Sequence, residues 1–175
     1  MKLKLLRYPD PFLNKKVAPF DFDKHDAKQI EAEMIELMTK ENGVGLAATQ
    51  VGLDAQIFII KPEGLEGYED NKPFALINPV ITAVSQETVL GEEGCLSFPL
   101  LFFKVKRPTG MVIECLDSSG KECTIELVGW NARIAGHEYD HLYGINYVDR
   151  VSKLKLDIAK KKQSKLLKRF GAYIK

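Results

Sequence analysis

The chain has 175 residues, of which 25 are Lys or Arg and 24 are Asp or Glu, so its formal net charge of +1 indicates no charged partner. A hydrophobic fraction of 45% excludes disordered and collagen-like chains, and the length favours a single domain over residues 1–175. No apolar stretch approaches the ~18 to 20 residues of a membrane span, and no apolar signal core precedes Tyr8-Pro9-Asp10-Pro11. Three cysteines do not make a disulfide framework. We therefore expect a cytoplasmic protein with no membrane partner.

The first predicted helix begins with a cap at Asp23 and ends at Asn42. Its apolar residues follow helical spacing, and Gly43 stands where a left-handed C-terminal cap is expected. These apolar residues are Ala27, Ile30, Met34, Leu37 and Met38. The helix leads into a segment of small residues that begins at Gly43.

Four short segments between turn signals are predicted to be strands. They are residues 55–60, 74–77, 111–116 and 122–128. Asn78-Pro79 predicts a turn after the second strand, and residues 117–120 join the last two strands as a hairpin. A second helix is predicted over residues 130–143, ended by Gly144. Strands and helices mix without a regular βαβ rhythm, so the fold class is α+β.

The most specific feature of the second helix is the pair His137 and His141. Two histidines four residues apart share one helical face and can hold one metal ion, while Glu138 between them points at a bound water. Ile134 and Trp130 precede His137 on the same face, where they would line an apolar wall beside the metal. The alternative is a chance pairing of two surface histidines.

A catalytic metal site of this kind needs a third protein ligand. Metalloproteases with this motif take a Glu or His from further along the chain, but no Glu or His follows His141. Cysteine is the alternative donor. Cys115 and Cys123 lie in the predicted hairpin, where they are more simply interpreted as small buried side chains. Cys95 lies in an irregular, glycine-containing segment, residues 91–99, and is the predicted third ligand.

The small-residue segment 43–50 does not fit a nucleotide loop. It lacks the third glycine of a dinucleotide loop and the Gly-Lys-Ser/Thr of a phosphate loop. Its small side chains instead indicate a backbone pressed against another group, and Gln50 supplies an uncharged hydrogen-bond donor. The alternative is a tight turn that Gln50 caps.

Together these three segments resemble the peptide deformylase family. The family's Gly-x-Gly-x-Ala-Ala-x-Gln loop, Glu-Gly-Cys-Leu-Ser segment and His-Glu-x-x-His-type helix appear in the family's order as residues 43–50, 93–97 and 137–141. The similarity extends over nearly the whole chain. It implies antiparallel β-sheets packed around a central metal-binding helix, with an N-terminal helix and a C-terminal helix. We expect a monomer.

The resemblance also implies a cofactor and a substrate. Cys95, His137 and His141 would hold one divalent metal ion, natively Fe²⁺, with Zn²⁺, Ni²⁺ or Co²⁺ as possible occupants. The substrate would be a nascent peptide that begins with N-formylmethionine, and the product would be formate. Two alternatives stay open: a metallopeptidase acting on ordinary peptide bonds, and a ribosome-associated binding protein with a closed structural metal site.

The family mechanism assigns a task to each remaining group. Metal-bound water would be the nucleophile, with Glu138 as general base and then general acid. The Gln50 side chain and the backbone N–H of Leu96 would stabilise the oxyanion. Gly45 would form a tight floor that admits a formyl group and excludes an acetyl methyl group.

A substrate pocket is expected around the Met side chain of the formylmethionine, with Ile134 and Trp130 in contact with it. The predicted substrate-binding residues are Gly43, Val44, Gly45, Glu93, Gly94, Trp130, Arg133 and Ile134. Residues 98–103 depart from the commoner family pattern by being apolar, and Gly136 replaces a frequent Gln. These departures leave the catalytic residues intact and concern the outer substrate rim.

The C-terminal segment, residues 151–175, is predicted to be a basic helix. It contains eight Lys and one Arg against one Asp, a net charge of +8, and leaves −7 on the rest of the chain. In the family such an extension can dock on the ribosome near the tunnel exit, where lysines would meet rRNA phosphates. The alternative is an amphipathic helix that packs Leu154, Ile158 and Leu166 onto the body.

Overall fold

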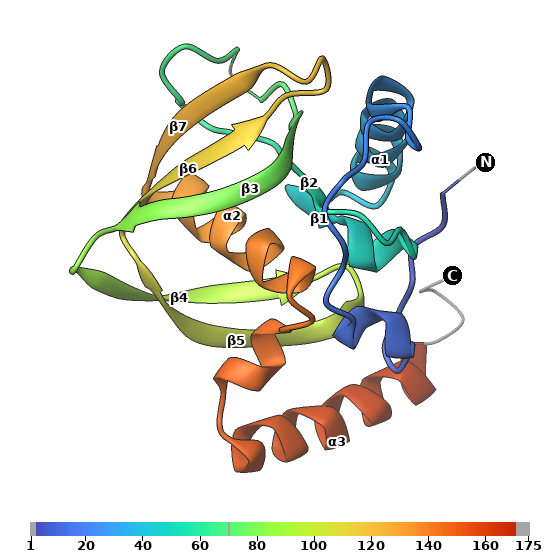
Figure 1. Cartoon of the computed structure of the whole chain (residues 1–175). Helices are drawn as coiled ribbons and strands as arrows, with labels where there is room; N and C mark the ends of the chain where they lie inside the picture. Colours follow the sequence, from blue (N-terminus) through green and yellow to red (C-terminus); the bar gives the residue numbers. More distant parts are fainter. Residues whose placement is uncertain (1–2, 70, 171–175) are drawn as a thin grey trace.

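A computed structural model describes residues 3–69 and 71–170 of the chain (Figure 1). Two sheets form the framework. The strands of the larger sheet follow the order β1-β2-β3-β6-β7, every neighbouring pair is antiparallel, and β4 and β5 form a separate antiparallel ribbon. The strands are β1 (Gly45–Ala47), β2 (Ile57–Ile60), β3 (Phe74–Val84), β4 (Thr88–Cys95), β5 (Phe98–Pro108), β6 (Gly110–Leu116) and β7 (Glu122–Val128).

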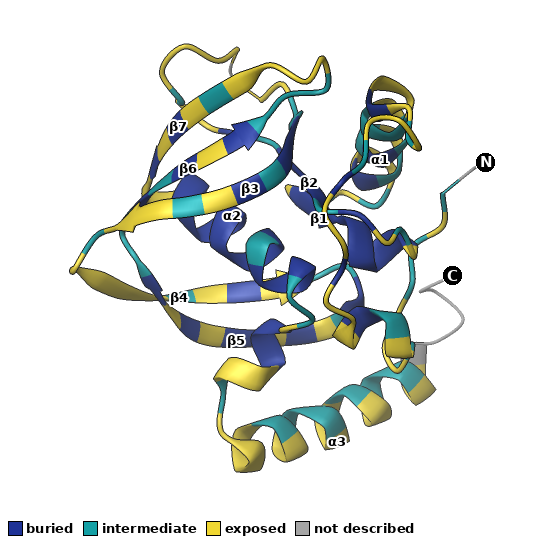
Figure 2. Ribbon diagram, viewed as in Figure 1, coloured by how far each residue is buried: buried dark blue, intermediate teal, exposed yellow. Residues whose placement is uncertain are grey.

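Three α-helices and three 3₁₀ turns complete the described chain. The helices are α1 (Ala27–Lys40), α2 (Gly129–Leu142) and α3 (Lys153–Phe170), and the turns are η1 (Pro11–Asn14), η2 (Ala48–Val51) and η3 (Tyr147–Arg150). Helix α2 lies between the larger sheet and the β4-β5 ribbon, and Figure 2 shows it as the most completely buried helix. The predicted α+β class, with antiparallel sheets around a central helix, is confirmed.

The hydrophobic core has two parts. The larger part lies between the five-stranded sheet, α1 and α2, and contains fully buried side chains such as Met34, Phe58 and Ile113. The smaller part lies between β5, η3 and α3 and includes Phe98 and Tyr147. Because α2 belongs to the boundary of both parts, its polar residues are buried and need partners inside the protein.

The ends of α1 differ from the prediction. The helix begins at Ala27 because the side chain of Asp26, not Asp23, accepts a hydrogen bond from the Gln29 N–H at 3.0 Å. At the other end Asn42, not Gly43, takes the left-handed conformation, with φ 57°. The Gly43 N–H then reaches the Met38 carbonyl at 2.8 Å, which completes the cap.

The turn predicted at Asn78-Pro79 is wrong. Strand β3 continues to Val84, and a break in its register with β6 absorbs the irregularity. Asn78 has φ 48°, and its side chain accepts from the Phe20 N–H and donates to the Phe20 carbonyl at 2.6 and 3.0 Å. The turn chemistry of Asn78 therefore serves a bulge inside a strand.

The irregular segment predicted over residues 91–99 is mostly strand. Strand β4 ends at Cys95 and β5 begins at Phe98. Glu93 pairs with Phe103 and Cys95 pairs with Phe98, so residues 99–102 of β5 face Gly94 alone. Cys95 thus lies at the end of the ribbon, beyond a bulge in which residues 99–102 lie opposite Gly94.

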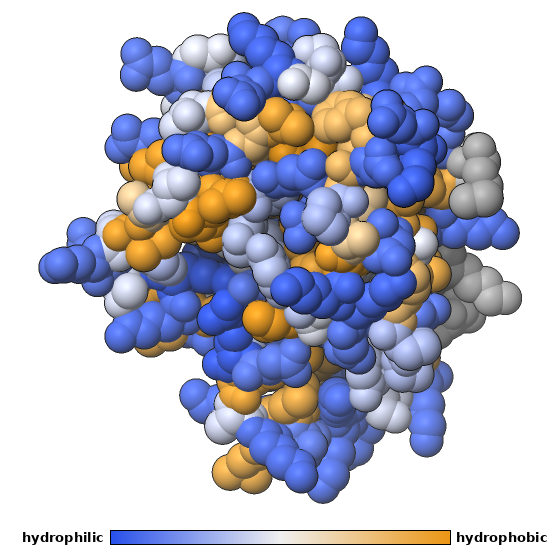
Figure 3. Space-filling view, in the orientation of Figure 1, coloured by the Kyte–Doolittle hydropathy of each residue, from blue (hydrophilic) through white to orange (hydrophobic). Residues whose placement is uncertain are grey.

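The predicted basic helix is observed over Lys153–Phe170, and residues 171–175 lie outside the described residues. The expected packing of Leu154 and Ile158 is wrong, because these side chains are 70% and 60% exposed. Leu156 and Ala159 contact the smaller core instead. Figure 3 shows a mostly hydrophilic surface along the lower edge, where α3 lies. No helix in the described part of the chain is both long and apolar enough to span a bilayer.

Candidate active site

Three side chains that could hold a metal ion meet between β4 and α2. Cys95 ends β4, and His137 and His141 face it from α2. Their ligand atoms lie within 4.8 Å of one another, and Cys95 Sγ is 3.4 Å from His141 Nε2. Among the described residues, this is the one group of three or more His, Cys, Asp or Glu side chains that could hold an ion.

These donors fit a divalent transition metal. Bonds of about 2.0–2.3 Å to nitrogen and sulfur would draw the three side chains only slightly closer together. Thiolate and imidazole are the ligand types that select zinc, iron, cobalt and nickel over magnesium and calcium. Burial lowers the pKa of His141 well below its ordinary value, so this ring is neutral and able to bind a metal.

Glu93 orients the other histidine. Its Oε2 lies 3.0 Å from His137 Nδ1, which leaves Nε2 of the ring for the metal. Burial opposes protonation of His137, but hydrogen bonds with Cys95 and Glu93 outweigh it and raise the pKa to about 10. These contacts place the ring between Glu93 and Cys95.

Two arginines fix Glu93 in turn. Arg107 donates to both carboxylate oxygens at 2.9 Å, and Arg133 Nη1 donates to Oε1 at 2.9 Å. Arg107 also pairs with Asp140 of α2, which ties β5 to the helix that carries the histidines. Burial acts to raise the pKa of Glu93, but hydrogen bonds from Arg107 and His137 outweigh it and lower the pKa to about 2. Glu93 is thus ionised at every ordinary pH.

Gln50 both caps a turn and faces the metal ligands. Its Oε1 accepts from the Ala47 N–H at 2.8 Å, which is the capping role considered from the sequence. Its Nε2 lies 3.3 Å from Cys95 Sγ and 3.2 Å from Ser97 Oγ. Because the cap fixes which end of the amide carries the oxygen, the NH₂ group is the end presented to the site.

Glu138 is a buried carboxyl group beside the metal ligands. Its Oε2 has no hydrogen-bond partner in the described chain. Burial is the main cause that raises its pKa to about 7, with nearby Glu93 and Asp140 acting in the same direction. A Cβ atom at Gly45 would lie 2.8 Å from Glu138 Cδ, so only glycine leaves room for this carboxyl group.

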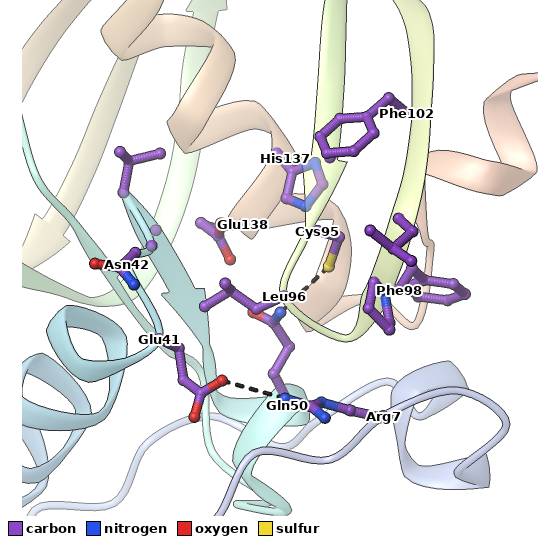
Figure 4. A pocket seen from close by; sticks show the side chains of 16 residues that line it. Arg7, Glu41, Asn42, Gln50, Cys95, Leu96, Phe98, Phe102, His137 and Glu138 are labelled. Atoms are coloured by element: carbon purple, nitrogen blue, oxygen red, sulfur yellow. Dashed lines mark hydrogen bonds and ion pairs between the residues drawn. The ribbon is translucent and has the colours of Figure 1, made fainter. Parts of the chain in front are cut away.

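A groove of about 410 Å³ opens onto these groups. Figure 4 shows Cys95, His137, Glu138 and Gln50 converging on it, with Leu96 beside them. Its walls come from the segment after α1 and from the start of β5. They include Glu41, Asn42, Gly43, Val44, Gly45, Phe98, Pro99, Leu100 and Phe102.

A side pocket of about 60 Å³ adjoins the groove. Val44, Trp130 and Ile134 supply its apolar wall, and His137 and Glu138 also line it. Six of the eight predicted substrate-binding residues therefore line this side pocket. The other two, Gly43 and Gly45, line the groove. The six are Val44, Glu93, Gly94, Trp130, Arg133 and Ile134.

Arg133 and Glu93 have their hydrogen bonds inside the protein. Arg133 donates to Glu93 and to the carbonyls of Val89, Gly91 and Val105 at 2.9 to 3.2 Å. Arg133 is 7% exposed and Glu93 is 5% exposed. We therefore expect both residues to shape the pocket wall rather than to bind a substrate through polar contacts.

Two groups at the site were missed from the sequence. Arg107 pairs with Asp140 of α2, the helix that carries His137 and His141, and both residues are buried. Asp140 lies between His137 and His141, so its position in the sequence could have indicated a role at the site. Arg107 lies in β5, a strand that the sequence did not predict. Cys115 and Cys123 face each other across β6 and β7, with their Sγ atoms 3.2 Å apart and no metal-binding group joined to them among the described residues.

The sequence profile of the family described as polypeptide deformylase matches residues 2–157 of the chain. The chain belongs to the peptide deformylase family. This membership confirms the resemblance and the enzyme class predicted from the three motifs.

Individual peptide deformylases agree with this assignment. The peptide deformylase of Wolbachia sp. subsp. Brugia malayi (strain TRS) is 37% identical over 175 residues, which cover 97% of this chain and 98% of that protein. Peptide deformylase 1B, chloroplastic, of Oryza sativa subsp. japonica is 39% identical over 153 residues, 86% of this chain. The chain spans only 55% of that plant relative's length. The crystal structure of the peptide deformylase from Ehrlichia chaffeensis has a TM-score of 0.82 at 36% identity, covering 94% of this chain and 96% of that chain.

Proposed function

We propose that this peptide deformylase removes the formyl group from N-terminal formylmethionine of nascent polypeptides and releases formate. The observation that supports this most strongly is the convergence of an unpartnered buried carboxyl group, an oriented amide and three metal donors on one groove. Amide hydrolysis needs an activated water, a stabilised oxyanion and a proton for the leaving nitrogen.

Cys95, His137 and His141 would hold one divalent metal ion, and we propose Fe²⁺ as its native identity. When bound, the ion would supply Lewis acidity, which lowers the pKa of water and polarises a carbonyl oxygen. The thiolate donates more charge than a third imidazole would, which favours a metal with adaptable coordination.

Glu138 would move the protons. A carboxyl group whose pKa is raised to about 7 by burial can both accept and return a proton near neutral pH. A bound cation would lower this pKa and favour the ionised form that accepts the first proton. The free Oε2 is the atom available for this transfer, first from water and then to the departing α-amine.

Gln50 and Leu96 would stabilise the negative charge that develops on the formyl oxygen. The Gln50 amide is preorganised by its cap on Ala47, so donating its NH₂ group costs no rearrangement during the reaction. The backbone N–H of Leu96, beside the groove, is the second proposed donor.

The substrate would enter with its formyl group against Gly45 and its Met side chain in the side pocket. Only a hydrogen is attached to the formyl carbon, so the close packing of Gly45 against Glu138 leaves space for it and little for an acetyl methyl. Val44, Trp130 and Ile134 provide an apolar surface for the Met side chain.

Ribosome contact through α3, the cytoplasmic location and the monomeric state stay predictions. The basic side chains of α3 include exposed Lys161, Lys162 and Lys165, which suit a phosphate-rich partner.

The test is formate release from formyl-Met-Ala-Ser by protein loaded anaerobically with Fe²⁺. We expect turnover of this peptide and none of Met-Ala-Ser, which an ordinary metallopeptidase would cleave. Glu138→Ala should lower kcat by about 10²- to 10⁴-fold with metal content unchanged, whereas Glu122→Ala, on an exposed carboxyl group of β7, should leave kcat unchanged. Full activity of Glu138→Ala would refute its role.

A further inference from the structure

We propose that helix α3 positions the outer wall of the substrate groove, and that Gln163 is the positioning residue. This inference rests on the proposed function, because the wall is taken to contact the peptide beyond its formylmethionine. Gln163 does not line the groove, so it would act only through the segment that it holds.

The outer wall is the bulge formed by residues 99–102 of β5. Four residues here face the single residue Gly94 of β4, so they have no one-to-one partners in the ladder, and Leu101 anchors the bulge in the smaller core. Leu100 and Phe102 project from the bulge to line the groove. Their side chains are 40% and 61% exposed, which leaves them free to contact a bound peptide.

The backbone at Leu100 needs support from outside the strand. Its φ is 61°, in the left-handed region that a branched side chain rarely occupies. Such a conformation persists only where the surroundings enforce it. A wall built on Leu100 therefore depends on contacts that hold the residues on either side of it.

Side chains from two other elements hold the carbonyls that flank Leu100. Gln163 Nε2 of α3 donates to the Pro99 carbonyl at 2.6 Å. Tyr147 of η3 donates its hydroxyl to the Leu101 carbonyl at 2.8 Å. Tyr147 is buried in the smaller core, whereas Gln163 sits at the edge, so Gln163 is the contact that can be changed without opening the core.

A second contact from α3 acts indirectly on Phe98, the residue that precedes the wall. Lys160 Nζ lies 3.1 Å from the Tyr8 hydroxyl and 4.4 Å from the centre of its ring. Tyr8 stacks on Phe98, with ring centres 5.3 Å apart, and Phe98 lines the groove just before the bulge. Helix α3 therefore contacts the wall directly through Gln163, and about one helical turn away Lys160 reaches the neighbouring Phe98 only through Tyr8.

This arrangement predicts an effect on peptide binding without an effect on the chemical step. Loss of the Gln163 hydrogen bond should raise KM about two- to tenfold for substrates that extend past Met. A substrate that ends at Met does not reach the bulge, so its KM should not change. The groups around the metal are fixed separately through Glu93 and Arg107, so kcat should stay the same.

The experiment measures kcat and KM of metal-loaded protein for formyl-Met-Ala-Ser and for N-formylmethioninamide. Gln163→Glu keeps the size of the side chain but cannot donate to the Pro99 carbonyl, and Gln163→Ala removes the hydrogen bond altogether. Both should raise KM for the tripeptide alone, while Ser164→Ala, at the exposed neighbouring position, should change neither KM. In a Leu100→Ala background the effect of Gln163→Glu should shrink, because the wall side chain is already absent.

Unchanged KM for both substrates in the two Gln163 variants would overturn the inference, and so would an equal rise for both. Thermal unfolding of each variant shows whether an equal rise comes from general loss of structure. These outcomes are distinct from failure of the proposed function, in which the wild-type protein itself would release no formate from either substrate.

Discussion

The inner part of the active site and its outer rim are held by different kinds of contact. Around the metal ligands, Glu93, Arg107 and Asp140 form a buried network of ion pairs. At the rim, the Pro99 and Leu101 carbonyls of the bulge each accept one uncharged hydrogen bond, from Gln163 at the edge of the protein and from buried Tyr147. Breaking a buried charged network is costly, whereas loss of one uncharged hydrogen bond at the edge costs little. We therefore expect substitutions in the buried network to cause large losses of activity or stability. Substitutions at the rim should cause small changes in the KM for peptides.

After Glu138, the largest effect is expected at Gln50. Gln50→Ala should lower kcat by about 100-fold or more, because one oxyanion donor is removed. Gln50→Glu separates this role from capping, since a carboxylate can still accept from the Ala47 N–H but cannot donate to an oxyanion. Steady-state kinetics of both variants, with exposed Gln86→Ala as control, provide the measurement. Retained activity in Gln50→Glu would leave Gln50 with the capping role alone.

A similar loss is expected at Gly45. The Cβ of Gly45→Ala would meet the Glu138 carboxyl group and push it from its place. Misplacement of a reacting group by about 1 Å can cost about 100-fold in rate. Gly110→Ala is the matched control, because its Cβ would meet nothing closer than 3.4 Å. Equal kcat values for the two variants would contradict the close packing described at Glu138.

Glu93 tests the network through stability. Glu93→Gln should lower the free energy of unfolding of the metal-free protein by about 3–5 kcal/mol at pH 7, because Arg107 is left buried without its full partner. The exposed neighbour Glu92→Gln is the control, and urea unfolding is the measurement. A Glu93→Gln variant as stable as its control would argue against the network.

The pH dependence of this difference follows from the lowered pKa of Glu93. Its ordinary value is 4.5 and its value in the folded protein is about 2. The ionised carboxylate therefore contributes its full stability above pH 4.5, and the contribution is lost as the pH falls through about 2. The gap between wild type and Glu93→Gln should be constant from about pH 7 to pH 5.5 and shrink in acid.

The smallest effect on peptide kinetics is expected on the outer face of α3. Replacing exposed Lys161, Lys162 and Lys165 with Gln should leave kcat and KM for formyl peptides unchanged. Ribosome binding should weaken. The slope of the logarithm of the binding constant against the logarithm of the salt concentration should fall in size by about one for each phosphate that a lysine no longer neutralises. Co-sedimentation at several salt concentrations measures this, and an unchanged slope would exclude α3 as the anchor.

Local patterns predicted the cluster of Cys95, His137 and His141 better than they predicted the residues that support it. His137 and His141 follow from helical spacing, and Cys95 follows from the shortage of other donors. Arg107 could not be predicted, because its partners Glu93 and Asp140 lie 14 and 33 residues away along the chain. The pairing of β4 with β5 brings Glu93 near Arg107, and the packing of α2 against β5 adds Asp140.

Two errors in the fold have the same origin. Asn78-Pro79 has the composition of a turn, but β6 pairs with β3 on both sides of it and makes it a bulge. On α3, Leu154 and Ile158 share a helical face, yet the body of the protein packs against Leu156 and Ala159. Tertiary contacts, which no local pattern contains, decided both outcomes.

The most direct test of the central claim is titration of the metal-free protein with Co²⁺, followed by visible absorption. We predict one ion per chain with a thiolate-to-cobalt band in the wild-type protein and in Cys115→Ser. Cys95→Ser should lose the band and bind the ion more than about 100-fold more weakly, because loss of a ligand should exceed the 10- to 100-fold cost of losing an outer-shell partner. Binding of one ion by Cys95→Ser with wild-type affinity would contradict the account.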